Sequence, residues 1–562
     1  MATVFRALLL ASVWVVAASM ASAAEQGRAS AGGEVLYNGI RLPPEWPPRL
    51  PPPTEKPMPV PYLADPPEVV PIDVGRQLFV DDFLIEKTDL ARTFHRPEYH
   101  TGNPVVTPDK AWEKQGRAPF AAVFSDGVWY DPAERLFKMW YMASIFAGTA
   151  CATSRDGLRW EKPALDAVEA GTNLVDRRRR DSSTVWLDWM ENDPNRRWKM
   201  ATATVRDGRR GWFLSVHASP DGIRWGDPIA ESSPIGDRTT IFYNPFRRVW
   251  VYGIRSSGPR GRQRQYREHP DLAAGATWRD DDRYEWVASD GLDPRNPNPE
   301  FKGLAPQLYN LDAVAYESLM LGLFAVWQGP NNSECAKRGI HKRNEVLLGF
   351  SRDGFHWHRP DRERFLAATE KEGSWRWGNV QSCGGGCLVV GDRLYFYFSG
   401  RALTSAFWDG AASTGLAFLR RDGFASMDAG ETEGTLTTRP VTFNGKHLFV
   451  NADCDGGSLA VEVLDSGGKV IEPFTRANCS PVSADKTLVA VTWKGAEDLA
   501  AVRGRPVRLR FHLTRGSLYA FWVSPDASGA SHGYVAAGGP GFTGPTDTAG
   551  RAAYDAAKAL LK

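Results

Sequence analysis

The 562-residue sequence has no excess of either charge and no long basic stretch. Its 68 Lys and Arg residues nearly balance its 66 Asp and Glu residues, which leaves a formal net charge of +2. Nucleic-acid-binding domains carry a clustered basic face that neutralises phosphates, so this composition argues against a nucleic-acid partner. We expect a neutral, polar partner instead.

Long apolar runs are also scarce, and no stretch after the N-terminus reaches the roughly 18 residues that span a bilayer. No membrane partner is therefore expected. At the N-terminus, Arg6 precedes an apolar run that begins at Ala7, and small residues follow up to Ala24. This order is typical of a secretory signal peptide, which we predict over residues 1–24. The mature chain is expected to be secreted or periplasmic.

Cysteine is rare, with six residues, and its spacing does not predict a metal site. An exported chain permits disulfides, and we favour Cys454 with Cys479 because both lie in the C-terminal region. Three glycines separate Cys383 from Cys387, which is not a metal-knuckle spacing, so a local disulfide or buried thiols are favoured over a metal. No metal site and no cofactor are predicted. A structural calcium ion is compatible with the sequence, although no ligand spacing requires it.

Proline is concentrated in residues 25–73, where the chain reads RLPPEWPPRLPPPTEKPMPVPYLADPPEVVP from residue 41 onward. Such a segment forms neither regular ladders nor helices, so it predicts an extended linker or a strap along a domain surface. Folded structure is expected to begin near Val74.

A short motif recurs along the middle of the chain. Its clearest copies are SRDGLRW at 154–160, SPDGIRW at 219–225 and SRDGFHW at 351–357, and degenerate copies begin at His269 and Arg420. The spacing of roughly fifty to eighty residues suits a four-stranded antiparallel blade with its loops. Asp-Gly forms a tight turn with positive φ, so we interpret the motif as structural and not catalytic.

A second repeat consists of a strand, a polar turn and an aromatic strand. Five such hairpins are expected at 123–141, 185–200, 241–252, 311–324 and 387–399. Five hairpins with five turns predict a five-bladed β-propeller over residues 74–428.

Shorter strands follow from about Met427 at regular spacing. They are expected at 435–443, 447–451, 458–464, 487–493, 507–513 and 517–522. This pattern predicts a β-sandwich over residues 429–525. The Gly/Ala-rich residues 526–562 are expected to form a flexible tail with a short helix near its end. The predicted fold class is thus all-β, a five-bladed β-propeller followed by a β-sandwich.

Several strings resemble a known enzyme superfamily. RQLFVDDFLIE at 76–86, FKMWY at 137–141, the SRDG turns and GTLTTRP at 434–440 resemble glycoside hydrolases of families 32, 43 and 68, in particular exported bacterial "family 32 N-terminal-like" proteins. The resemblance covers residues 74–523. It implies a five-bladed propeller with carboxylates at the starts of its innermost strands, where they face one funnel. Glycoside cleavage needs an acid and a second carboxylate in such a place.

The candidate catalytic residues follow from aligning the hairpins. Asp181 and Asp237 hold the same position, each seven residues before the turn, so they are expected to face the same funnel. In the fourth blade, Asp312 is expected to face the same funnel, because side chains alternate along a strand and those two residues apart share a face. Glu345 is a candidate acid, and Asp82 is a candidate on the resemblance alone. The alternative for each is a strand-entry or turn-capping role.

Candidate substrate-binding residues surround these carboxylates. Arg117, Arg238 and His95 would bond sugar hydroxyls or an acidic sugar. Trp375 and Trp377 would stack on sugar rings. Arabinan-acting members of the superfamily have Asp-Pro where this chain has Ala118-Pro119, and Glu113 or Arg117 would substitute for the missing carboxylate. The run Arg177–Arg180 is either a solvated loop or a selector of an anionic glycan.

The motif WMNDPNG of the sucrose-acting members is not reproduced in its expected place, which disfavours fructan hydrolysis. The sequence therefore predicts an exported glycosidase that acts on a polysaccharide or oligosaccharide. The alternative is a non-catalytic carbohydrate-binding propeller that retains the scaffold and has lost the acid. The sequence predicts no oligomeric state.

Overall fold

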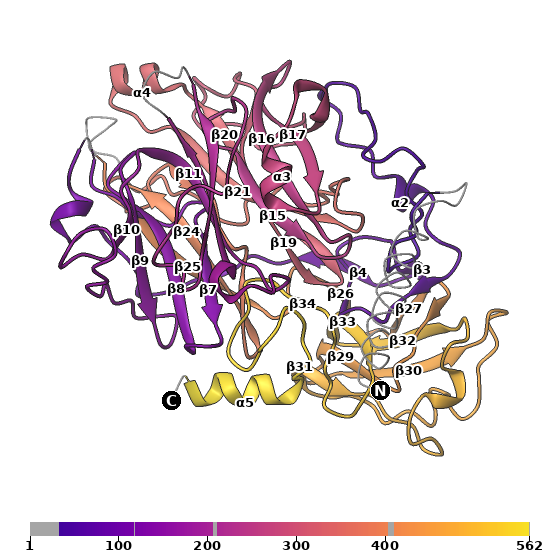
Figure 1. The fold of residues 1–562 in the computed structure, drawn as a ribbon. Helices are drawn as coiled ribbons and strands as arrows, with labels where there is room; N and C mark the ends of the chain where they lie inside the picture. The colour runs from indigo at the N-terminus through magenta and orange to yellow at the C-terminus, as the bar shows by residue number, and fades with distance from the viewer. Residues whose placement is uncertain (1–32, 117, 206–210, 403–409, 561–562) are drawn as a thin grey trace, which may run out of the picture.

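The computed structural model describes residues 33–116, 118–205, 211–402 and 410–560, and the predicted signal peptide lies outside these ranges. The all-β class is confirmed, since sheets dominate the described chain (Figure 1). The α-helices are short: α2 (Pro61–Ala64), α3 (Leu272–Ala276), α4 (Asn332–Arg338) and α5 (Arg551–Leu560).

None of the helices in the described part of the chain has the length and apolar character needed to cross a membrane.

The first three sheets are antiparallel and follow one another along the chain. The first contains β6 (Ala121–Ala122), β7 (Val128–Asp131), β8 (Leu136–Ala143), β9 (Thr149–Ser154) and β10 (Leu174–Asp176). The second contains β11 (Arg180–Leu187), β12 (Trp198–Thr204), β13 (Phe213–Ser219) and β14 (Ala230–Glu231). The third contains β15 (Thr240–Asn244), β16 (Val249–Gly258), β17 (Gly261–His269) and β18 (Tyr284–Ala288).

A nine-stranded sheet follows and consists of two halves. The first half contains β19 (Gln307–Glu317), β20 (Leu319–Gly329) and β21 (Arg343–Ser351), with β34 (Tyr534–Val535) on its edge. The second contains β22 (Asn379–Gln381), β23 (Leu388–Val390), β24 (Arg393–Arg401), β25 (Ala412–Arg420) and β5 (Glu98–Tyr99). The halves meet at a single parallel pair, Asn344 with Asn379. The early strand β5 therefore completes a half that is formed by much later residues.

The predicted hairpins are confirmed as antiparallel strand pairs. They are β7–β8, β11–β12, β15–β16, β19–β20 and β23–β24. The Ser-x-Asp-Gly turns are also local structural devices, as predicted. At the first of them, Ser154 Oγ accepts the Gly157 N–H at 2.9 Å and Asp156 Oδ1 accepts the Leu158 N–H at 2.8 Å. Gly157 has φ of +74°, which explains why glycine stands there.

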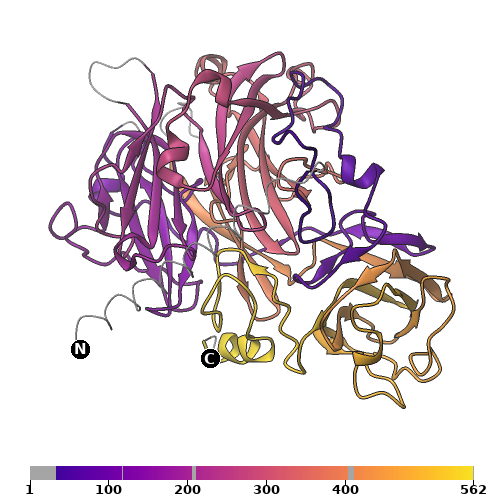
Figure 2. The ribbon, with the colours of Figure 1, turned by 45° about the vertical axis from the view of Figure 1, so that its right-hand side comes forward.

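Hydrogen bonds join the starts of these sheets in chain order and then return to the first sheet. The donors and acceptors are Val185 N to Asp126 O, Ser182 N to Asp237 O, Thr240 Oγ1 to Leu311 O, Cys383 N to Asp312 Oδ2 and Gly384 N to Phe124 O. The three sheets and the two halves of the nine-stranded sheet thus form a closed circuit. Figure 2 shows these sheets from a second direction.

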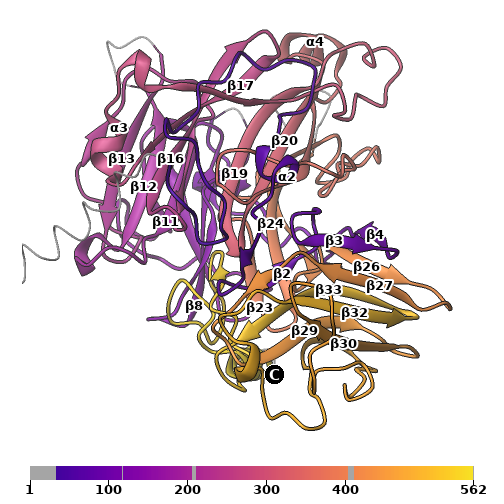
Figure 3. The same ribbon diagram turned by 90° about the vertical axis from the view of Figure 1, so that its right-hand side faces the viewer.

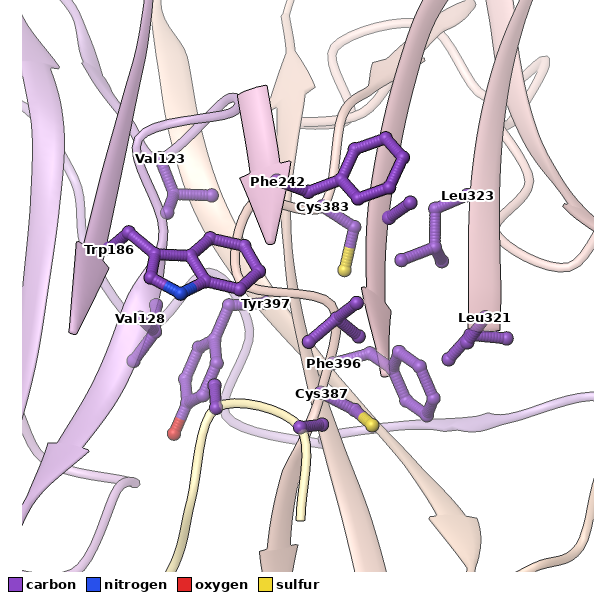
Figure 4. Packing of buried hydrophobic residues seen from close by; sticks show 14 of the residues in the cluster. Val123, Val128, Trp186, Phe242, Leu321, Leu323, Cys383, Cys387, Phe396 and Tyr397 are labelled. Carbon is purple, nitrogen blue, oxygen red and sulfur yellow. The ribbon is translucent and has the colours of Figure 1, made fainter. Parts of the chain in front are cut away.

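Apolar side chains fill the space where the sheets converge (Figure 4). Val123, Trp186, Phe242, Leu323 and Phe396 come from the first three sheets and the two halves of the nine-stranded sheet, and they belong to one buried cluster. Burial of this much apolar surface is the main stabilising contribution to the arrangement. The centre is consequently a packed apolar core. Polar side chains that could take part in chemistry are therefore expected at the strand ends.

Two further sheets, which we call the C-terminal sheets, share a separate core. They lie beside α5 and, in Figure 3, below the first three sheets and the nine-stranded sheet. One contains β31 (Asp485–Ala490), β29 (His447–Asp453), β33 (Gly516–Ser524), β26 (Ala425–Ala429), β4 (Ala91–Phe94) and β2 (Gln77–Leu78). The other contains β3 (Ile85–Thr88), β27 (Gly434–Thr438), β32 (Arg508–Thr514) and β30 (Ser458–Leu464). Phe79 lies between them, with its ring centroid 6.4 Å from that of Phe511 and 5.7 Å from that of Phe521.

The N-terminal strands depart from the expected division of the chain. Residues 77–94, which were assigned to the propeller, pair with the two C-terminal sheets through β2, β3 and β4. Within the Pro-rich segment, β1 (Val70–Pro71) pairs with β28 (Val441–Thr442). Tyr62 is buried and its hydroxyl donates to His356 O. The segment therefore lies as a strap that connects both groups of sheets.

The end of the chain differs from the expected flexible tail. β34 pairs with β19 through Val535 and Tyr316, and Val535 is fully buried. Asp547 Oδ2 accepts from Arg421 at 2.8 Å, and both side chains are buried. The glycine and alanine content did not predict this packing, because these small residues occur in packed segments as well as in flexible ones. The predicted short terminal helix is present as α5.

The expected Cys454–Cys479 disulfide is absent, and all six cysteines are buried free thiols. Cys479 Sγ accepts the Val461 N–H at 3.3 Å instead. Cys383 and Cys387 lie in the apolar core (Figure 4) and are not bonded to each other. Buried cysteine behaves as a small apolar residue, which accounts for these positions.

Candidate functional site

Two neighbouring sheets begin with a carboxylate and a guanidinium that meet. Asp181 is the second residue of β11, and Arg238 precedes β15. Arg238 Nε lies 2.9 Å from Asp181 Oδ1, and the two side chains are 8% and 9% exposed. Ser182 holds the strands together, because its N–H and its Oγ both donate to Asp237 O. The structure thus brings together the two strand starts that the hairpin alignment paired.

Asp237 is the more accessible carboxylate at this place. Its side chain is 41% exposed, and Arg255 Nε lies 3.6 Å from its Oδ1. Burial raises the pKa of Asp181 to about 6, against the opposing charge of Arg238, and the nearby charge of Asp237 adds to the increase. An aspartate with this pKa holds its proton up to about pH 6, well above the range of a free aspartate, and a raised pKa of this kind suits a general acid.

Tyr309 lies beside the pair and is surrounded by cations. Lys342 Nζ donates to its hydroxyl at 3.0 Å, and the Arg238 guanidinium carbon lies 5.5 Å from the ring centroid. Burial disfavours ionisation of Tyr309, but the charges of Lys342 and Arg238 outweigh it and lower the pKa of the phenol. Gln381 Oε1 accepts from Arg238 at 3.3 Å and completes the cluster.

A second ion pair lies behind the first. Arg180 Nη2 is 2.7 Å from Asp126 Oδ1, and both side chains are fully buried. Burial raises the pKa of Asp126 to about 7, although Arg180 opposes the increase. Arg180 also donates to the backbone oxygen of Asp181 at 3.0 Å. This pair therefore positions the start of β11 and is closed to a substrate.

The run Arg177–Arg180 is divided among different environments. Arg177 pairs with Glu169 and is 57% exposed, whereas Arg178 pairs with Asp176 at 2.9 Å. A groove of about 670 Å³ opens beside this run. Its lining includes Arg178, Arg179, Thr204, His217, Trp225 and Glu231. Arg179, which lines the groove, precedes Asp181 by two residues along the chain.

Two of the predicted catalytic residues are committed to other contacts. Asp312 is buried and accepts from Asn310 Nδ2 at 2.9 Å and from Cys383 N at 3.0 Å. Glu345 is fully buried and lies 2.8 Å from Arg343 Nη2, with Arg364 and Gln328 on its other oxygen. Both carboxylates therefore hold neighbouring segments of the chain together.

Asp82 and His95 lie with the C-terminal sheets and not with Asp181. Asp82 is 74% exposed and pairs with Arg92, a residue of β4. The neighbouring Asp81 is the buried member of the two, and it pairs with Arg352 at 2.8 Å. His95 contacts Ser426 at 2.8 Å, and burial lowers its pKa. The segment at 76–86 therefore connects the C-terminal sheets to the nine-stranded sheet.

The remaining predicted binding residues are distributed over the fold. Glu113 is buried and contacts Tyr141 Oη at 2.7 Å and Lys162 Nζ at 2.7 Å. The ring of Trp375 packs on Phe398 with centroids 5.5 Å apart, and Trp377 contacts His341 edge-on at 5.0 Å. Arg117 lies outside the described residues. Arg238 alone among the described binding candidates contacts a predicted catalytic residue.

Sequence reasoning missed Tyr309 and Lys342. Tyr309 adjoins Asn310, the position that matches Asp181 in the hairpin alignment, so that register was a usable signal. Lys342 precedes β21 in a loop, and no pattern marked it. Within the described ranges, no group of three His, Cys, Asp or Glu side chains is arranged to hold a metal ion.

No protein-family model matches the sequence, and no curated protein matches it. Solved structures do show similarity. One is a thermostable family-43 glycoside hydrolase, with 12% identity, a TM-score of 0.37, and coverage of 55% of this chain and 93% of that one. A β-1,2-mannobiose phosphorylase from Listeria innocua has 13% identity, a TM-score of 0.37, and coverage of 59% and 98%. A family-32 β-fructofuranosidase from Bombyx mori has 10% identity, a TM-score of 0.35, and coverage of 76% and 94%.

These similar structures are carbohydrate-active enzymes.

Proposed function

We propose that this protein is an exported glycoside hydrolase that acts on a polysaccharide or oligosaccharide. Asp181 would protonate the leaving oxygen, and Asp237 would act as the second carboxylate that attacks the anomeric carbon or activates water. The observation that carries the proposal is the raised pKa of Asp181 beside an accessible Asp237. The motif resemblance supplies the substrate class.

The proposed scaffold is a five-bladed propeller followed by a β-sandwich. The closed circuit of hydrogen bonds through three sheets and two half-sheets supports five blades. The shared core of the two C-terminal sheets supports the sandwich. In this scaffold, β5 would close the ring because it completes the last blade from the N-terminal side. Secretion rests on the N-terminal sequence pattern.

Arg238 has a defined place in the proposed mechanism. Its guanidinium fixes the orientation of Asp181 and stabilises the carboxylate that remains after proton transfer. The groove beside Arg178 and Trp225 would accept neighbouring sugar units of a longer chain. The reaction requires no redox chemistry.

The alternative is a carbohydrate-binding propeller without catalysis. It is favoured by the placement of Asp82, Asp312 and Glu345, which leaves two of the five predicted catalytic carboxylates, Asp181 and Asp237, together at neighbouring strand starts. In that case Asp181 and Arg238 would be a structural ion pair.

A screen of the purified protein against neutral and acidic polysaccharides separates these two functions. Release of reducing ends by wild type, with its loss in Asp181→Asn, supports hydrolysis. Binding of a polysaccharide without release, at equal affinity in wild type and Asp181→Asn, identifies the binding function and overturns hydrolysis.

A further inference from the structure

The cations around Tyr309 outnumber the carboxylates that contact them. Besides Lys342 and Arg238, the Arg262 guanidinium carbon lies 5.6 Å from the Tyr309 ring centroid. Arg264 donates to the backbone oxygens of Arg238 and Tyr309. We call Arg238, Arg262, Arg264 and Lys342 the Tyr309 cations.

Only one of the Tyr309 cations has a carboxylate partner among the described residues, and that partner is Asp181. Lys342 donates to the Tyr309 hydroxyl, and Arg262 donates to Gln307 Oε1 at 2.7 Å. Arg264 is fully buried, and burial together with neighbouring arginines lowers its pKa to about 9. Asp237 and Asp312 act on Arg238 and Arg264 without an ion-pair contact, so the four cations face three carboxylates and an excess of positive charge remains.

Uncompensated charge is expensive at such a place. A buried cation is normally paired with an anion or loses its proton, because removing an unpaired charge from water is strongly unfavourable. Lys342 is 5% exposed, and Arg238 Nη1 is buried with no hydrogen-bond partner. An anionic group of a ligand would satisfy this donor and offset the excess charge.

The position of the cluster indicates which part of a ligand that anion belongs to. Arg238 contacts Asp181 through Nε and donates to Gln381 through Nη2, so an anion at Nη1 would lie beside the proposed catalytic acid. Tyr309 and Arg262 are partly exposed and provide the open side of the cluster. We propose that the substrate is an acidic sugar whose carboxylate or sulfate binds Arg238 and Lys342. This proposal rests on the proposed function, since it names the substrate class of the same site.

Matched pairs of oligosaccharides test the proposal by calorimetric titration. The probes are uronate oligosaccharides with their carboxyl-reduced forms, and sulfated oligosaccharides with their desulfated forms. We expect one acidic member to bind on the order of tenfold to a hundredfold more tightly than its neutral form, which is the range of charge-assisted hydrogen bonds. The pair that shows the preference tells a carboxylate from a sulfate.

The variant Lys342→Met should reduce that preference to less than about threefold, whereas Lys337→Met, an exposed lysine of α4, should retain it. Equal binding of acidic and neutral forms by wild type overturns the acidic-sugar proposal and leaves hydrolysis intact. Loss of preference in both lysine variants, or in neither, also overturns the role of Lys342. Absence of any binding and any hydrolysis across the probes overturns the proposed function together with this inference. The wild-type comparison needs no variant, so it decides the question even if Lys342→Met does not fold.

Discussion

Arg238 Nε lies 2.9 Å from Asp181 Oδ1 at the start of two neighbouring sheets, and both side chains are almost wholly withdrawn from solvent. The pair places a fixed positive charge on a carboxyl group whose pKa burial raises. The two effects act in opposite directions, so removal of either one changes the pH range in which Asp181 holds its proton.

The first prediction concerns the pH dependence of hydrolysis. Because the pKa of Asp181 is raised to about 6, its protonated form is present below pH 6 and is lost as the pH rises through that value. We expect kcat/KM to fall about tenfold per pH unit above that pKa, as for a single essential acid. In Arg238→Gln the opposing cation is lost, so the falling limb should move to higher pH. A limb that moves to lower pH, or does not move, contradicts this role of Arg238.

Glu345 is predicted to affect stability and not chemistry. It is fully buried between Arg343, Arg364 and Gln328. Glu345→Gln removes the carboxylate that pairs with Arg364 and one of the two that pair with Arg343, which also contacts Glu370. Removing one partner of a buried pair typically costs about 3–5 kcal/mol. Urea unfolding should show a lower midpoint for Glu345→Gln and an unchanged midpoint for Glu363→Gln, whose side chain is exposed. An unchanged midpoint in both variants would refute the structural role.

The C-terminal segment provides the third prediction. Asp547 accepts from Arg421 at 2.8 Å, and both side chains are fully buried, so Asp547→Ala leaves Arg421 short of an anion. We expect a loss of about 3–5 kcal/mol in unfolding free energy. Asp555→Ala on α5 is the matched control because Asp555 is exposed. Equal stability of the two variants would restore the view of residues 526–562 as a flexible tail.

Thiol titration tests the cysteine assignment. All six cysteines are buried and free, so native protein should react slowly with a thiol reagent. The unfolded, unreduced protein should react at six sites. A count of four would indicate one disulfide and favour the pairing of Cys454 with Cys479.

The repeats in the sequence predicted the hairpins well, because each hairpin is determined by contacts between residues that are close together in the sequence. Asp-Gly turns and alternating strands specify their own geometry, as the contacts of Ser154 and Asp156 show. The same register paired Asp181 with Asp237, and Arg238, which follows Asp237 and precedes β15, contacts Asp181.

Contacts between distant segments were not predictable in this way. Nothing local indicates that Asp81 pairs with Arg352 or that Arg421 pairs with Asp547, since each pair is separated by more than a hundred residues. Asp82 is a catalytic candidate on the family resemblance alone, but in the structure it pairs with Arg92 of β4, among the C-terminal sheets. Lys342 was missed for the same reason, because only the fold brings its loop to Tyr309.

The central claim is that Asp181 and Asp237 together cleave a glycosidic bond, and the most direct test is kcat/KM for three variants on the best substrate from the polysaccharide screen. We expect Asp181→Asn and Asp237→Asn each to lose about 10²–10⁴-fold, the usual contribution of acid and base groups. Asp237→Asn should keep wild-type thermal stability because its side chain is 41% exposed, whereas Asp181→Asn should be less stable because Arg238 loses its buried carboxylate partner. Asp82→Asn should retain wild-type activity because its side chain lies on the C-terminal sheets. Full activity in both Asp181→Asn and Asp237→Asn would contradict the account.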